Sequence, residues 1–153
     1  MWRGGLAGAV LALVVLGCGG RDLAPYQAAI DELGLPPTWH IAQTTTQSQG
    51  GQGGCVELIN GTCPSVTRYY VVAGALPDVL QAANIAVAAE GFGRIDVTHP
   101  ACDVVSSGPP CYLTGIKGEL AIDVNVYRPG DDVDQLGLSR PDAAIVRIIV
   151  HRH

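Results

Sequence analysis

The sequence is poor in aromatic side chains and in lysine. Aromatic residues make up 5% of the 153 residues, and Lys117 is the single lysine. With so few rings available, the core must consist mainly of valine, isoleucine, leucine and alanine side chains. The formal net charge is −5, and no cluster of lysine and arginine concentrates positive charge. Such a chain repels the phosphate backbone of nucleic acids, so we expect no nucleic-acid partner.

Motifs that mark common catalytic and redox sites are also missing. The chain contains neither Gly-x-Ser-x-Gly, the nucleophile motif of many hydrolases, nor a Cys-x-x-Cys pair. Serines lie in segments with no recognisable base nearby in the sequence, and the four histidines are scattered. We therefore expect no catalytic residues, no cofactor and no metal site, and a protein that is not an enzyme.

The first 17 residues have the character of an export signal. Arg3 and the amino terminus are positive, and an apolar run follows from Leu6 to Gly17. This run suits a signal peptide, and it is too short to cross a hydrocarbon core of about 30 Å as a helix. Removing it would change the formal net charge from −5 to −6, because Arg3 is its only charged side chain.

The motif that ends this segment, Val15-Leu16-Gly17-Cys18, resembles the lipobox of bacterial lipoproteins. The resemblance implies that residues 1–17 are a signal peptide, that Cys18 carries lipid, and that residues 18–24 form a tether. The mature protein would then face the extracytoplasmic side of the cell membrane, with the lipid bilayer as its partner. Two or three acyl chains, palmitate among them, hold a protein firmly in the membrane, because each CH₂ group buried in the bilayer contributes about 0.8 kcal/mol to the free energy of binding. An ordinary secretory signal and an uncleaved membrane anchor are the alternatives.

The four remaining cysteines form an even set: Cys55, Cys63, Cys102 and Cys111. In an oxidising compartment this number predicts two disulfides. Of the three possible pairings we prefer the local one, Cys55–Cys63 and Cys102–Cys111. Asn60-Gly61 is a strong hairpin signal within the first interval. Both intervals are longer than the pairs that zinc sites favour, which argues against a Cys₄ site.

Hydrophobic periodicity predicts a single α+β domain over residues 25–153. We expect helices at 26–33 and 77–90 and strands at 39–46, 66–73, 94–98, 112–116, 119–127 and 143–151. The predicted architecture is an antiparallel sheet of about five to six strands with two helices packed on one face. In the strand 119–127 the inward side chains are Leu120, Ile122, Val124 and Val126. In the helix 77–90 they are Val79, Leu80, Ala83 and Val87, with Ile85 as a further candidate.

Two groups of side chains suggest a second hypothesis, a metal-binding protein or a metal-dependent hydrolase. The loop Asp131-Asp132-Val133-Asp134 is acidic, but two ligand positions of the calcium-loop pattern hold residues that do not match it. His151 and His153 share one face if the last strand continues, whereas His40 and His99 lie elsewhere. The simpler interpretation is a solvated turn and surface histidines. Asp123 and Arg147 would lie opposite one another if the last two strands pair.

The leading functional hypothesis is a non-enzymatic envelope lipoprotein that binds a protein or a small ligand, or serves a larger envelope system. A third hypothesis is an inhibitor-like module that inserts the Cys55–Cys63 hairpin into a partner.

Overall fold

The computed structural model describes residues 22–47, 64–96, 111–133 and 136–153. In chain order the elements are α1 (Ala24–Asp31), β1 (His40–Gln47), β2 (Ser65–Val72), α2 (Leu76–Ala89), β3 (Gly93–Asp96), β4 (Cys111–Lys117), β5 (Leu120–Tyr127) and β6 (Ala144–Arg152). The predicted order of helices and strands is confirmed, with the bounds displaced by a few residues. The leader, Cys18, His99 and four of the five cysteines lie outside the described residues.

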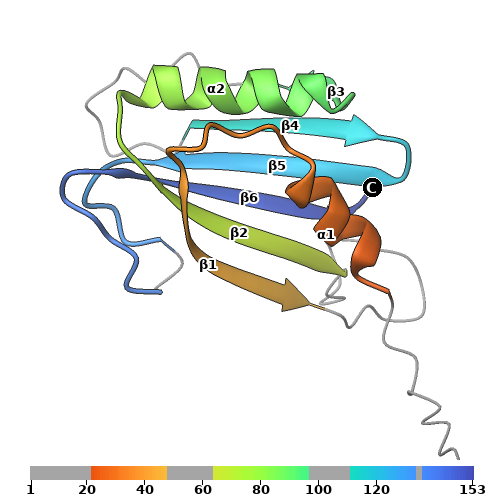
Figure 1. Cartoon of the computed structure of the whole chain (residues 1–153), viewed down its shortest axis with the longest axis horizontal. Coiled ribbons are helices and arrows are strands. Elements are labelled where there is room, and N and C mark those ends of the chain that lie inside the picture. The colour runs from red at the N-terminus through yellow and green to blue at the C-terminus, as the bar shows by residue number, and fades with distance from the viewer. Residues whose placement is uncertain (1–21, 48–63, 97–110, 134–135) are drawn as a thin grey trace, which may run out of the picture.

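The strands form one antiparallel sheet in the order β1-β2-β6-β5-β4-β3. Figure 1 shows α2 beside β4 and α1 at the ends of β2 and β6. α1 contacts β2 and β6, while α2 contacts β4 and β5. Both helices share one hydrophobic core with the same side of the sheet. The predicted α+β architecture, with two helices on one face of an antiparallel sheet, is confirmed.

Strict alternation along β5 builds the centre of this core. Ile122, Val124 and Val126 are fully buried beneath the helices. α2 contributes Val79, Ala83, Ala86 and Val87 to the buried set. Ile85 was wrongly predicted to join them, because it is 60% exposed. A helix turns by about 100° per residue, so position 85 faces away from positions 83 and 87.

The turn between β4 and β5 is displaced by one residue from its predicted centre. Lys117 pairs with Leu120, so Gly118 and Glu119 make the turn. Gly118 has a φ of 61°, a left-handed conformation that glycine adopts without a steric penalty. The two-residue connection fixes the register of β5 against β4 and therefore which β5 side chains face the helices.

The alternation of residues 39–46 predicts that Trp39, Ile41, Gln43 and Thr45 share one side of a strand, and this prediction is wrong. The register against β2 shifts between Ile41 and Gln43. Ile41 lies opposite Tyr70, which is part of the helix-covered core, whereas Gln43 lies opposite Tyr69 on the other side. One extra residue in a strand reverses the facing of every residue that follows.

Arg68 ties α1 to the sheet. Among the residues that the structure describes, it is the only charged side chain that is buried. Its guanidinium donates a hydrogen bond to Asp31, the last residue of α1. Burial alone would lower the pKa of Arg68, but hydrogen bonds with Asp31 and Tyr70 raise it above its ordinary value. The buried guanidinium therefore stays charged and holds the end of α1 against β2.

No helix in the described part of the chain is long and apolar enough to cross a membrane.

Candidate binding face

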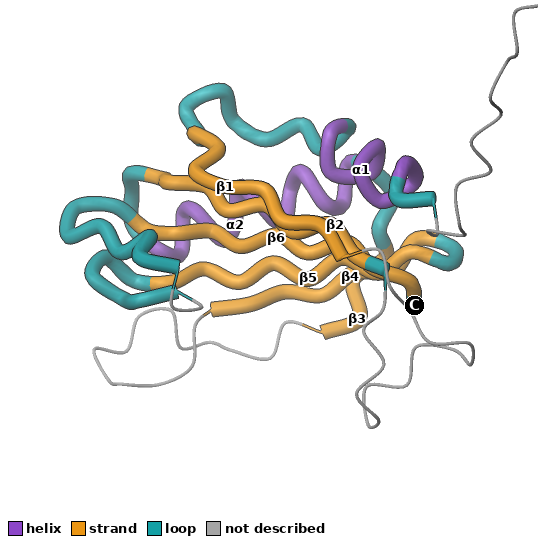
Figure 2. Tube along the Cα trace, turned by 90° about the horizontal axis from the view of Figure 1, so that it is seen from below, coloured by secondary structure: helices purple, strands orange, loops and turns teal. Residues whose placement is uncertain are grey.

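The sheet face opposite the helices carries the polar side chains of β4, β5 and β6, and we call it the helix-free face. Figure 2 shows the strands side by side in one layer with α1 above them. Strand register arranges this face in rows. One row runs Tyr112, Asn125, Arg147, Tyr69, and the next runs Thr114, Asp123, Ile149, Thr67. Neighbouring strands lie about 4.8 Å apart, so adjacent members of a row are within reach of a single small ligand.

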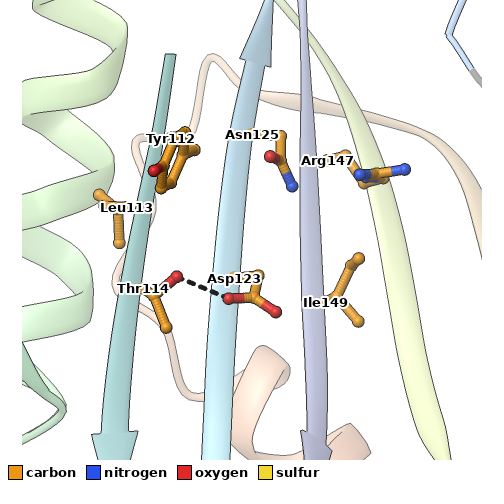
Figure 3. Close-up of a pocket in the computed structure, with 7 residues that line it drawn as sticks. All are labelled: Tyr112, Leu113, Thr114, Asp123, Asn125, Arg147 and Ile149. Atoms are coloured by element: carbon orange, nitrogen blue, oxygen red, sulfur yellow. Dashed lines mark hydrogen bonds between the residues drawn. The ribbon is translucent and has the colours of Figure 1, made fainter. Parts of the chain in front are cut away.

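Thr114, Asp123 and His151 form a hydrogen-bonded network across three strands. The Thr114 hydroxyl donates to Oδ1 of Asp123 over 2.7 Å, a bond drawn in Figure 3. Nε2 of His151 lies 2.9 Å from Oδ2 of the same carboxylate, and Nδ1 lies 2.8 Å from the backbone oxygen of Arg152. Each imidazole nitrogen thus lies within hydrogen-bond distance of an oxygen atom.

This network lowers the pKa of Asp123 below its ordinary value. Burial by itself would raise the pKa of the carboxyl group. Hydrogen bonds from His151 and Thr114, together with the charges of His151 and Arg147, outweigh that effect. Asp123 is therefore held ionised in the folded protein, by a hydrogen bond from β4 and by the side chains of His151 and Arg147 on β6.

The lowered pKa of Asp123 predicts a loss of stability in acid. A carboxyl group with a depressed folded-state pKa stabilises the fold above its unfolded pKa, about 3.9 for aspartate, and this contribution disappears as the pH falls through the folded-state pKa. We expect the free energy of unfolding to fall as the pH is lowered from about 5 to about 3, and to fall less in Asp123→Asn. Urea unfolding at several pH values measures this.

Thr114→Val is the matched variant for this test, because it removes one of the two donors and keeps a β-branched side chain. Its acid sensitivity should lie between those of the wild type and Asp123→Asn. Identical pH profiles for all three proteins would show that the network does not influence the carboxyl group.

An open hollow of about 360 Å³ lies beside the network. Figure 3 shows the residues that line it: Tyr112, Leu113, Thr114, Asp123, Asn125, Arg147 and Ile149. Asn125 stands directly between Tyr112 and Arg147 in the strand register. Within the described ranges, its amide makes no hydrogen bond. The Arg147 guanidinium carbon lies 5.6 Å from the centre of the Tyr127 ring, a cation–π distance. The hollow therefore combines one open amide with a carboxylate and a guanidinium.

The geometry does not match a hydroxyl nucleophile that is activated by histidine. A hydroxyl nucleophile needs a hydrogen bond to a general base such as histidine. Here the Thr114 hydroxyl donates to Asp123, and both nitrogens of His151 already face other oxygens.

The loop between β5 and β6 covers one end of the helix-free face. Val133 is fully buried and packs with Tyr69 and Ile145, with Tyr127 and Leu138 at the margin. The interpretation of this loop as a solvated turn is wrong at Val133, whose apolar side chain between aspartates was the available signal. The turn interpretation is confirmed at Asp131, whose Oδ2 accepts a bond of 3.0 Å from the backbone of Arg128.

The predicted pairing of Asp123 with Arg147 is wrong in its register. β5 and β6 do pair, but Ile149 lies opposite Asp123, and Asn125 lies opposite Arg147. The ionic partner of Asp123 is His151, one diagonal step along β6. The interpretation of His151 as a surface histidine without a role is therefore wrong. The hydrophobic pattern could not reveal this contact, because a register that is displaced by two residues keeps every residue on its face.

The structure gives no support to a shared metal site among its described residues. No group of three or more histidine, cysteine, aspartate or glutamate side chains within them is placed to hold an ion. His151 is bound to Asp123, and His153 follows the end of β6, its backbone donating to Glu119. Asp134 lies outside the described residues.

Cys111 is buried on β4 and disulfide-bonded. Its partner is outside the described residues, so the predicted pairing of Cys102 with Cys111 and of Cys55 with Cys63 stays a prediction.

Comparisons with protein-family models, curated proteins and solved structures gave no significant match. The class of protein is therefore defined by its own geometry: an α+β domain of two layers, with helices on one sheet face and a polar hollow on the other.

Proposed function

We propose that the protein is a lipid-anchored extracytoplasmic binding protein without catalytic activity, and that the helix-free face is its binding surface. The observation that carries the binding role is the hollow, where the open Asn125 amide stands between Tyr112 and Arg147. Ligand sites typically combine a concave surface with a few convergent polar groups. The anchor rests on the lipobox-like motif that ends at Cys18.

Replacing Cys18 by serine tests the anchor. We expect the wild-type protein to partition into the detergent phase of a Triton X-114 extract, with the mass of a lipidated chain that begins at Cys18. Cys18→Ser should move to the aqueous phase and lose the lipid mass, because serine has no thiol for the thioether bond.

Gly20→Ser is the matched control, since it adds the same side chain two residues away and should leave partitioning unchanged. Cys18→Ser protein that stays in the detergent phase with the wild-type mass would contradict the anchor.

A photocrosslinking amino acid tests the binding surface. We expect p-benzoylphenylalanine in place of Tyr112 to form adducts with an envelope component when intact cells are irradiated. The same amino acid in place of Ile85, which is 60% exposed on α2, should form none, because it lies on the opposite side of the molecule. Equal labelling from both positions, or none from position 112, would contradict a ligand on the helix-free face.

A further inference from the structure

The polar groups of the hollow include both donors and acceptors. Asn125 offers an amide N–H pair and a carbonyl oxygen. Each carboxylate oxygen of Asp123 accepts one bond, from Thr114 or His151, and a carboxylate has about four acceptor positions in all. A ligand in this hollow therefore meets planar groups that can each contact two neighbouring polar atoms.

The charges in the hollow offset one another. Asp123 is ionised, and the positive charge of Arg147, which also lines the hollow, offsets it. The chain as a whole carries a formal charge of −5, which opposes the approach of an anion. A neutral ligand with many hydroxyl groups meets no such opposition, and each hydroxyl both donates and accepts a hydrogen bond.

The position of the hollow argues against an extended peptide. Peptides that add to a sheet use the free backbone groups of an edge strand. The hollow lies over β4, β5 and β6. β5 and β6 pair with strands on both sides, and β3 pairs with β4 from Thr114 to Ile116, so the backbone groups of these residues are occupied. Side chains alone provide the contacts, and the Tyr112 ring and the Ile149 side chain give apolar surface beside the polar groups.

We propose that this hollow binds a neutral saccharide, with Asn125 and Asp123 bound to its hydroxyl groups and Tyr112 against a sugar ring. The volume of about 360 Å³ falls within the range of small-ligand sites, about 300–1,000 Å³. The inference rests on the proposed function, since it names the ligand of the helix-free face.

Saturation-transfer NMR on the full-length protein, solubilised in a detergent without a sugar headgroup, tests the proposal. The probes are chitotetraose, maltotetraose, cellotetraose and xylotetraose, with succinate as a small anion. We expect saturation transfer to at least one tetrasaccharide and none to succinate. Asn125→Ala should raise the dissociation constant at least tenfold. Asn125→Asp, which keeps the shape of the side chain but removes the amide donors, should raise it by a similar factor.

Gln81→Ala is the matched control, because it removes an exposed amide from α2, on the other side of the sheet, and should leave the affinity unchanged. No transfer to any tetrasaccharide, binding of succinate instead, or full affinity in both Asn125 variants would overturn the saccharide. If the saccharides fail while the crosslinker at position 112 still labels a component, the ligand class is wrong and the proposed function stands. If that crosslinker also fails, the proposed function falls.

Discussion

Replacing Ile122 by alanine is expected to lower the free energy of unfolding by about 2–5 kcal/mol. Ile122 is fully buried on β5, with Gly115 opposite it on β4 and Val150 opposite it on β6. The loss combines the transfer free energy of the deleted carbons with the cavity that they leave. The surrounding strands are paired on both sides and have little freedom to close that cavity. Urea unfolding with the disulfides oxidised measures the effect.

Ile85→Ala is the matched control because it removes the same atoms from an exposed position on α2. We expect its free energy of unfolding to change by no more than about 0.5 kcal/mol, as is usual for surface substitutions. Similar losses in Ile122→Ala and Ile85→Ala would show that the core has been assigned to the wrong sheet face.

Replacing Gly115 by valine should lower the free energy of unfolding by about 1–3 kcal/mol for the opposite reason, overpacking. Gly115 is buried where α2 and the segment after it lie on the sheet. A β-carbon at this position would lie 3.0 Å from Cβ of Phe92 and 3.3 Å from side-chain atoms of Ile122 and Val87. Valine adds two further methyl groups to that space, so α2 or the strand must shift. Thermal and urea unfolding would both report the loss.

Gly115→Ala should have a smaller effect than Gly115→Val, since it adds only the β-carbon. Gly34→Ala provides the control, because a β-carbon there meets nothing within 4 Å and the backbone φ is not in the left-handed region. We expect Gly34→Ala to be neutral or slightly stabilising. A Gly115→Val protein as stable as the wild type would mean that α2 does not pack closely on β4.

Most of the fold followed from local patterns. Alternating apolar residues identified β5 and its buried face, since a strand turns successive side chains to opposite sides. The predicted buried stripe of α2 is confirmed at Val79, Ala83 and Val87, because a helix of known period presents one face to the sheet. The prediction that Ile85 is buried is wrong, because an apolar side chain does not have to be buried.

The candidate site was only partly predictable. The sequence placed Asp123 and Asn125 on the face of β5 that points away from the core, and this facing is confirmed by the lining of the hollow. It did not reveal that Thr114 and His151 would meet Asp123, because these residues come from three strands. The register between β5 and β6 decides which partner Asp123 finds, and a displacement by two residues leaves the hydrophobic pattern unchanged.

By itself, the sequence determined the type and order of the elements, the apolar side of each central strand, and the expectation of a lipid anchor at Cys18. The tertiary structure alone decided which polar side chains share the helix-free face and which of them touch. The buried face of each strand follows from the alternation of apolar and polar residues, and this pattern can be read from the strand's own sequence. Contacts between strands depend on turn geometry and on the bulge in β1, and these are settled only when the whole sheet is assembled.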